Sequence, residues 1–154
     1  MVLGDGGNTT EILRLVELMG PGYNYHYVVA RDDVLSAQHI TIPGSVFRIC
    51  RPRTKGGAWW QALWHTLASL FQAFRVCRRV RPQATLGSGP SLMVPVALAT
   101  KVLGAKVIFV ETGSRVTRLS LTGRIMLRLA DLFFVQWEQL QQHYPQTILA
   151  GRLL

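Results

Sequence analysis

Two short loops in the second half of the sequence carry the residue types that could hold a ligand. The first is formed by Gly87, Ser88, Gly89 and Pro90, where small residues let a ligand or a turn come close to the backbone. The second runs from Glu111 to Arg115 and supplies one carboxylate and one guanidinium. A carboxylate can accept a proton or bind a hydroxyl, and an arginine can bind a phosphate.

The residues between these loops predict a β-α-β unit. A β-prone segment ends at Gly87, Pro90 suits the first turn of a helix, and Gly104 suits the end of that helix. The apolar run Val107–Val110 then predicts a strand that is buried on both faces of a parallel sheet. Because parallel sheets bind ligands beyond the carboxyl ends of their strands, we expect both loops to face one site.

A third glycine-rich loop lies near the start of the chain. Gly6, Gly7, Asn8 and Thr9 separate a minimal strand from an amphipathic helix. Backbone N–H groups at a helix N-terminus attract anions, so this loop is a candidate diphosphate site. It matches neither the dinucleotide fingerprint nor a P-loop. A tight β-α connection that binds nothing is the alternative.

Strands and helices alternate along the rest of the chain. We expect further strands at Tyr25–Ala30, His39–Ile42, Leu132–Val135 and Thr147–Ala150, and helices at Gly57–Val80, Thr117–Asp131 and Trp137–Tyr144. This alternation predicts an α/β fold with a doubly wound parallel sheet. A length of 154 residues predicts one domain that spans positions 1–154.

The expected helix Gly57–Val80 has an unusual composition. Its first turns hold three tryptophans, Trp59, Trp60 and Trp64, and basic residues flank the apolar run on both sides. This pattern is typical of a helix that lies in a membrane interface. The polar residues within the run argue against a transmembrane span. A core helix that packs on the sheet is the alternative.

The net charge of +9 indicates an anionic partner. Nucleic acid, an anionic membrane surface and phosphates all fit this charge. Nucleic acid is not expected, because the sequence has neither a recognition helix nor an aromatic RNA-binding pattern. The two cysteines lack the spacing of metal ligands, so we expect no metal site and no cofactor.

Several stretches together resemble a known family of glycosyltransferase subunits. The run Gly6–Glu11 resembles a Gly-Gly-His-Thr-x-Glu motif, with Asn8 at the histidine position. The other stretches are Glu111–Val116, Leu119–Gly123 and Asp131–Trp137. The chain is similar to the acceptor-side subunit of the two-part UDP-N-acetylglucosamine transferase of lipid-linked oligosaccharide synthesis, and to its bacterial exopolysaccharide counterparts. The Glu111 loop is also similar to the acceptor loop of the single-chain peptidoglycan transferase.

This resemblance implies the Rossmann-like N-terminal half of a GT-B glycosyltransferase. It implies a partner subunit that binds the UDP-sugar, and an acceptor that is a polyprenyl-diphosphate-linked sugar. The transferred sugar is then N-acetylglucosamine or a related hexose, and the chain alone is inactive. The expected location is peripheral, on the cytoplasmic face of the plasma membrane in bacteria or of the endoplasmic reticulum in eukaryotes. The alternative is a membrane-recruiting module without an acceptor site of its own.

The resemblance also implies roles for single residues. Asn8 cannot act as a general base at neutral pH, so Glu111 becomes the candidate catalytic residue, with a purely structural role as the alternative. The candidate acceptor and diphosphate residues are Gly6, Gly7, Asn8, Thr9, Gly87, Ser88, Gly89 and Arg115.

Overall fold

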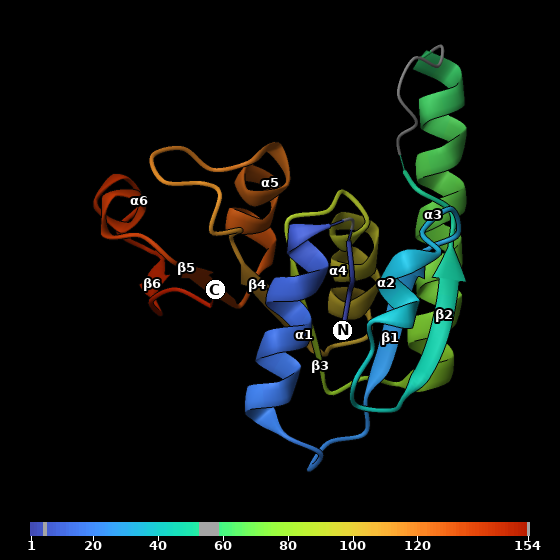
Figure 1. The fold of residues 1–154 in the computed structure, drawn as a ribbon. Coiled ribbons are helices and arrows are strands. Elements are labelled where there is room, and N and C mark those ends of the chain that lie inside the picture. The colour runs from blue at the N-terminus through green and yellow to red at the C-terminus, as the bar shows by residue number, and fades with distance from the viewer. Residues whose placement is uncertain (5, 53–58, 154) are drawn as a thin grey trace.

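The computed structural model describes residues 1–4, 6–52 and 59–153. Its helices are α1 (Gly7–Met19), α2 (Leu35–Gln38), α3 (Trp59–Val80), α4 (Met93–Val102), α5 (Leu121–Leu129) and α6 (Glu138–His143). Its strands are β1 (His26–Ala30), β2 (Ser45–Ile49), β3 (Ala84–Ser88), β4 (Lys106–Val110), β5 (Leu132–Val135) and β6 (Ile148–Leu149). Figure 1 shows that α3 stands at one end of the sheet, with its first turns extending past β2.

Every strand pairing in the described residues is parallel. One set of strands has the order β1-β2 and the other has the order β3-β4-β5-β6. Val2 joins the two sets, because it bridges in parallel to Val28 of β1 on one side and to Gly87 of β3 on the other. The order of the whole sheet is therefore β2, β1, the Val2 segment, β3, β4, β5 and β6.

This strand order reverses direction between the Val2 segment and β3. From Val2 the chain moves outward through β1 to β2, and it then returns through α3 to β3 and continues in the opposite direction. Such a reversal opens a crevice at the carboxyl ends of the two strands, where ligands of open α/β sheets bind. The predicted doubly wound parallel sheet is confirmed.

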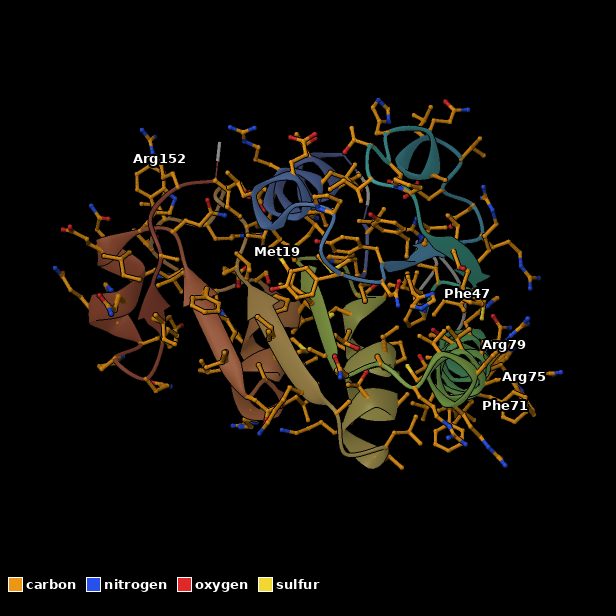
Figure 2. All side chains as sticks on the ribbon, turned by 90° about the horizontal axis from the view of Figure 1, so that it is seen from below. Met19, Phe47, Phe71, Arg75, Arg79 and Arg152 are labelled. Carbon is orange, nitrogen blue, oxygen red and sulfur yellow. The ribbon has the colours of Figure 1, made fainter. Side chains whose placement is uncertain are left out.

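Helices cover the sheet in two layers, as Figure 2 shows in the view from below. Side chains alternate between the faces of a strand, so Tyr27 and Val29 pack under α1 while Val28 and Ala30 face the other layer. That second layer contains α3, α4 and α5, and its buried residues include Met93 and Met126. The sheet is thus held between two apolar cores.

Two predicted elements are corrected by the structure. The strand expected at His39–Ile42 is wrong: this segment is irregular, and β2 begins only after Pro43 and Gly44. Gly44 lies so close to the Tyr25 carbonyl that a Cβ atom would overlap it, which allows β2 to start directly beside β1. The helix expected at Thr117–Asp131 begins at Leu121, because the Ser120 hydroxyl caps it by accepting from the Gly123 N–H over 2.8 Å.

Candidate functional site

Two glycine loops meet at the crevice between the Val2 segment and β3. Gly89 has φ +59°, and a Cβ atom at this position would overlap the side chain of Asn8. A Cβ atom added at Gly87, two residues earlier, would lie 2.7 Å from the Met93 Sδ atom. Glycine is therefore required at both positions for close packing, and the structure brings the Gly6–Thr9 and Gly87–Gly89 loops into contact.

The first turn of α1 has no side-chain cap and begins with exposed residues. Gly6 precedes the helix with φ +59°, and no described side chain accepts a hydrogen bond from the first turn. Gly6 and Gly7 are exposed, and Asn8 is half-buried. Uncapped N–H groups and the positive end of the helix dipole favour an anion at this point.

The carboxylate of Glu11 connects three segments of this edge. Its Oε2 atom accepts from the Ser88 hydroxyl over 3.0 Å, and its Oε1 atom accepts from the Thr112 hydroxyl over 3.1 Å and from the Gly113 N–H over 2.7 Å. Glu11 is 3% exposed. Sequence reasoning missed this residue, although its place at the end of the Gly6–Glu11 motif was the available signal.

Three of the predicted ligand-binding residues are used inside the protein. The Thr9 hydroxyl donates to the Gly4 carbonyl and lies 2.7 Å from the Ser36 hydroxyl. Ser88 is fully buried, and its hydroxyl is bound to Glu11. Gly87 is buried against Val2. These residues shape the two loops, and the loop residues that keep exposed surface are Gly6, Gly7, Asn8 and Gly89.

Glu111 lies at the end of β4 and has no exposed surface. Its Oε2 atom accepts from the N–H and the hydroxyl of Ser120, both over 3.1 Å, and its Oε1 atom accepts from the Thr112 N–H over 3.2 Å. A Cβ atom on Gly123 would overlap the same carboxylate. Glu111 therefore ties β4 to the start of α5, and in this position both of its oxygens are held by groups of the chain.

Burial raises the pKa of Glu111 above its ordinary value of 4.5. The hydrogen bonds from Ser120 and Thr112 and the charge of Arg115 act in the opposite direction but do not cancel this effect. Arg115 itself is exposed, and its N–H donates to the Thr112 carbonyl over 3.0 Å. Its guanidinium is thus the exposed cation of the Glu111–Arg115 loop.

A groove of about 690 Å³ runs beside the first turns of α1. Its walls include Gly6, Thr9 and Thr10 on one side, and residues 32–36 with His39 on the other. Asp33 lines it and is 8% exposed, and its Oδ2 atom has no hydrogen-bond partner among the described residues. The volume lies within the range of about 300–1,000 Å³ that small-molecule sites occupy. Asp33 is a second residue that sequence reasoning did not select.

The tryptophan-rich part of α3 presents apolar side chains to solvent. Trp60 is 54% exposed and Trp64 is 71% exposed, and Leu67 and Phe71 continue the same side of the helix. The side chain of Trp59 lies outside the described residues. Within the described chain, none of the helices combines the length and the apolarity that crossing a membrane requires.

Comparison with protein families gives one match over nearly the whole chain. The model described as "Oligosaccharide biosynthesis protein Alg14 like" matches residues 1–153. Human "UDP-N-acetylglucosamine transferase subunit ALG14" is 35% identical over 176 residues, which cover 100% of this chain and 82% of the human protein. The Candida albicans protein of the same name is 33% identical and is covered to 77%.

Comparison with solved structures identifies the fold. Acinetobacter baumannii MurG superposes with a TM-score of 0.69 at 22% identity, over 88% of this chain and 40% of that protein. A putative UDP-N-acetylglucosamine 2-epimerase from Listeria monocytogenes gives a TM-score of 0.69 at 16% identity, over 92% of this chain and 39% of that one. The chain thus spans about two-fifths of these structures, and the predicted Rossmann-like half of a GT-B protein is confirmed.

Proposed function

Because the chain belongs to the Alg14-like family of oligosaccharide biosynthesis proteins, we propose that it is the acceptor-binding subunit of a two-part glycosyltransferase. With a UDP-sugar-binding partner, it transfers N-acetylglucosamine or a related hexose to a polyprenyl-diphosphate-linked sugar. The observation that carries this proposal is the contact between Asn8 and Gly89 at the strand-order reversal, beside the open first turn of α1.

The acceptor's diphosphate is assigned to the first turn of α1. The exposed N–H groups of Gly6 and Gly7 and the dipole of a 13-residue helix supply positive potential there. Arg115 adds an exposed positive charge from the Glu111–Arg115 loop. The groove beside Thr10 and Asp33 then receives the acceptor's sugar, because its volume suits a small molecule and the exposed hydroxyl of Thr10 can hydrogen-bond to sugar hydroxyls.

In this proposal Glu111 is a positioning residue. A carboxylate without exposed surface, held by Ser120 and Thr112, does not reach an acceptor hydroxyl unless the loop rearranges. Its hydrogen bonds instead fix the loop that carries Arg115. The competing hypothesis is that Glu111 is the catalytic residue, as a general base or as a ligand of the acceptor hydroxyl.

The nucleotide-sugar site is assigned to the partner subunit. Curated relatives are named as subunits. The superposition with MurG covers 88% of this chain but only 40% of MurG. Residues 1–154 form a single domain in this scheme, since the Val2 segment joins both strand sets into one sheet. The exposed apolar stripe of α3, formed by Trp60, Trp64, Leu67 and Phe71, holds the domain peripherally on the cytoplasmic face of the membrane.

Reconstituted transfer tests the proposal. The chain is co-purified with its UDP-sugar-binding partner, and transfer from UDP-N-acetylglucosamine to a short-chain polyprenyl-diphosphate-N-acetylglucosamine is measured in detergent. We expect transfer only with both subunits present, and we expect Asn8→Asp to reduce it while the complex stays intact by size-exclusion chromatography. Unchanged transfer in this variant would instead favour the membrane-recruiting module, whose only function is carried by α3.

A further inference from the structure

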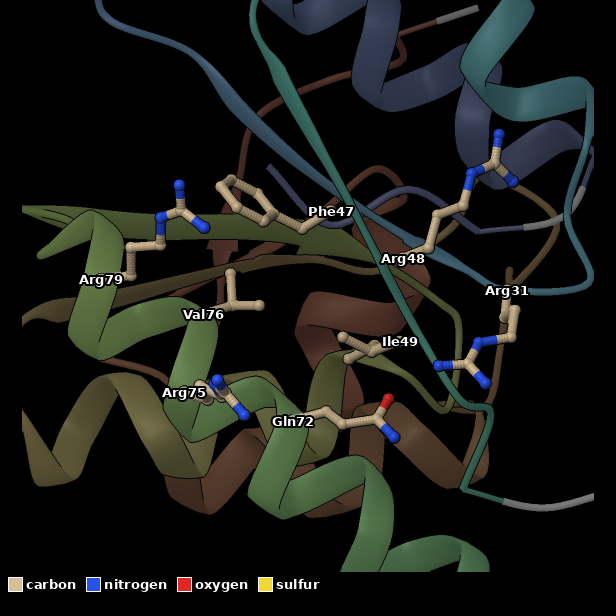
Figure 3. Close-up of a pocket in the computed structure, with 8 residues that line it drawn as sticks. All are labelled: Arg31, Phe47, Arg48, Ile49, Gln72, Arg75, Val76 and Arg79. Carbon is tan, nitrogen blue, oxygen red and sulfur yellow. The ribbon is translucent and has the colours of Figure 1, made fainter.

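A second groove lies between the edge strand β2 and helix α3, and no described residue of the glycine loops lines it (Figure 3). Its volume is about 250 Å³. Phe47 and Ile49 of β2 and Val76 of α3 form its apolar floor. Gln72 closes one end and is fixed there, because its Oε1 atom accepts from the Cys50 N–H over 2.8 Å. The groove thus has one wall from β2 and one from α3.

Arginines surround this floor. Arg75 and Arg79 lie one turn apart on α3, and Arg31 follows directly after β1. Arg48 also lines the groove, but its guanidinium donates to the Asp33 carbonyl over 3.2 Å on the other side of the strand. Of the described residues that line the groove, none is acidic.

Within the part of the chain that the structure describes, no carboxylate neutralises the three remaining guanidiniums. Among the described residues, Arg31, Arg75 and Arg79 take part in no ion pair. A cleft lined by one sign of charge over apolar walls concentrates counter-ions. The planar fork of a guanidinium binds phosphate oxygens in pairs, so the chemistry of the groove suits a phosphate.

The apolar stripe of α3 runs directly into this groove. Phe71 is 67% exposed and lies one turn before Arg75 on the same side of the helix. Leu67 and Trp64 continue the stripe toward the helix N-terminus and are 49% and 71% exposed. Figure 2 shows Phe71, Arg75 and Arg79 around the end of α3, with Phe47 beside them. A phosphate bound here would have an apolar surface next to it.

We propose that the groove between β2 and α3 binds the phosphate headgroup of an anionic membrane lipid, while Phe71, Leu67 and Trp64 contact its acyl region. A free soluble phosphate ester has the same charge but nothing to cover the stripe, so the lipid is the source that fits both features. This inference rests on the proposed membrane-bound function and adds a lipid site that is separate from the acceptor site at α1.

Vesicle sedimentation with a matched pair of double variants tests this site. The probe is phosphatidylcholine vesicles that contain phosphatidic acid, compared with vesicles that contain oleic acid at equal surface potential. We expect the full chain to bind the phosphatidic acid vesicles more tightly, and we expect Arg75→Gln/Arg79→Gln to weaken that binding about tenfold or more. The control Arg118→Gln/Arg128→Gln removes the same charge from exposed positions elsewhere and should change binding less than twofold.

Equal losses in the two double variants, or equal binding to both kinds of vesicle, would mean non-specific charge attraction and would overturn the proposal. Saturable binding of glycerol 3-phosphate to the groove, with no gain from vesicles, would assign the site to a soluble anion and would also overturn it. Circular dichroism of both variants controls for folding.

A sugar-transfer assay in detergent tests the proposed function separately from the lipid site. The Arg75→Gln/Arg79→Gln variant should transfer sugar to a short-chain acceptor at the wild-type rate, because the acceptor site is intact. Loss of lipid binding without any wild-type transfer would contradict the proposed function alone. Normal transfer with undiminished lipid binding in the variant would contradict the lipid site alone.

Discussion

The N–H of Gly113 donates to the Glu11 carboxylate over 2.7 Å, although 102 positions separate the two residues in the sequence. The same carboxylate holds Ser88, so one side chain of α1 fixes the loops that follow both β3 and β4. The geometry of the crevice therefore depends on a residue that need not touch the acceptor.

Removing this carboxylate should destabilise the protein. We expect Glu11→Ala to lower the free energy of unfolding by about 3 kcal/mol, because three donors lose their buried partner. Urea unfolding measures the change. The control Glu17→Ala lies on the same helix, but Glu17 is exposed and forms a surface ion pair with Arg14, so its effect should stay below about 0.5 kcal/mol. Similar values for the two variants would contradict the role assigned to Glu11.

Alanine substitutions at Gly89 and Gly104 can distinguish the effect of backbone strain from the effect of displacing Asn8. Gly89 has φ +59° and Gly104 has φ +76°, so alanine at either position should cost about 1–2 kcal/mol of stability. Only at Gly89 would the new Cβ displace Asn8, since nothing lies within 4 Å of one at Gly104. We expect Gly89→Ala to reduce transfer about tenfold and Gly104→Ala to leave it unchanged. Equal activity in the two variants would argue against the contact between the loops.

A negative charge at the start of α1 should affect stability and binding in opposite directions. Asn8→Asp places a carboxylate in the first helical turn, where the dipole stabilises it by about 0.5 kcal/mol. The same charge repels a diphosphate, so flotation on vesicles that carry a polyprenyl-diphosphate sugar should weaken about tenfold. Asn24→Asp is the charge control, because Asn24 is exposed and outside the site. A parallel loss in the control would point to general charge repulsion.

Replacing Glu111 by glutamine tests its role through pH. Burial raises the folded-state pKa, so the folded protein binds this proton more strongly than the unfolded chain does. The resulting stabilisation is complete below the ordinary value of 4.5 and is lost as pH rises through the folded pKa. We expect the stability of Glu111→Gln relative to wild type to increase from about pH 4 to about pH 7. Thermal unfolding at several pH values measures this trend.

The same Glu111→Gln variant separates a positioning role from a catalytic one. A positioning role predicts transfer within about threefold of wild type, because the amide oxygen can still accept from Ser120. Loss of a general base would lower the rate by about 10²–10⁴-fold. A loss of that size in a folded, partner-bound variant would restore Glu111 as the catalytic residue.

The stripe on α3 should contribute to membrane binding without contributing to the fold. Trp64 is 71% exposed, so Trp64→Ser should leave the unfolding free energy within about 0.5 kcal/mol of wild type. Flotation on anionic vesicles should decrease several-fold. Val102→Ser is the control, since Val102 is 75% exposed at the end of α4. Unchanged flotation of the tryptophan variant would remove α3 from the membrane contact.

Local patterns in the sequence determined most of the elements, and they indicated the loops that form the candidate site. Alternating apolar strands and helices predicted the parallel sheet, since burial on both faces leaves a continuous apolar run such as Val107–Val110. Glycine loops marked the strand ends because only small residues permit the close approach seen at Gly89. The prediction of a strand at His39–Ile42 was wrong, because a short apolar run does not show whether a neighbouring strand is there to pair with it.

Only the tertiary structure decided what each polar side chain does. Glu11 and Ser88 meet across 77 positions, and Thr9 meets Ser36 across 27, so their hydroxyls and carboxylate are occupied by partners that no local pattern indicates. The groove of Arg31, Arg75 and Arg79 likewise forms only when β1, β2 and α3 pack together. Sequence spacing fixes neighbours along a helix or strand, whereas long-range hydrogen bonds and burial depend on how the elements pack, and these determine which residues remain free to bind a ligand.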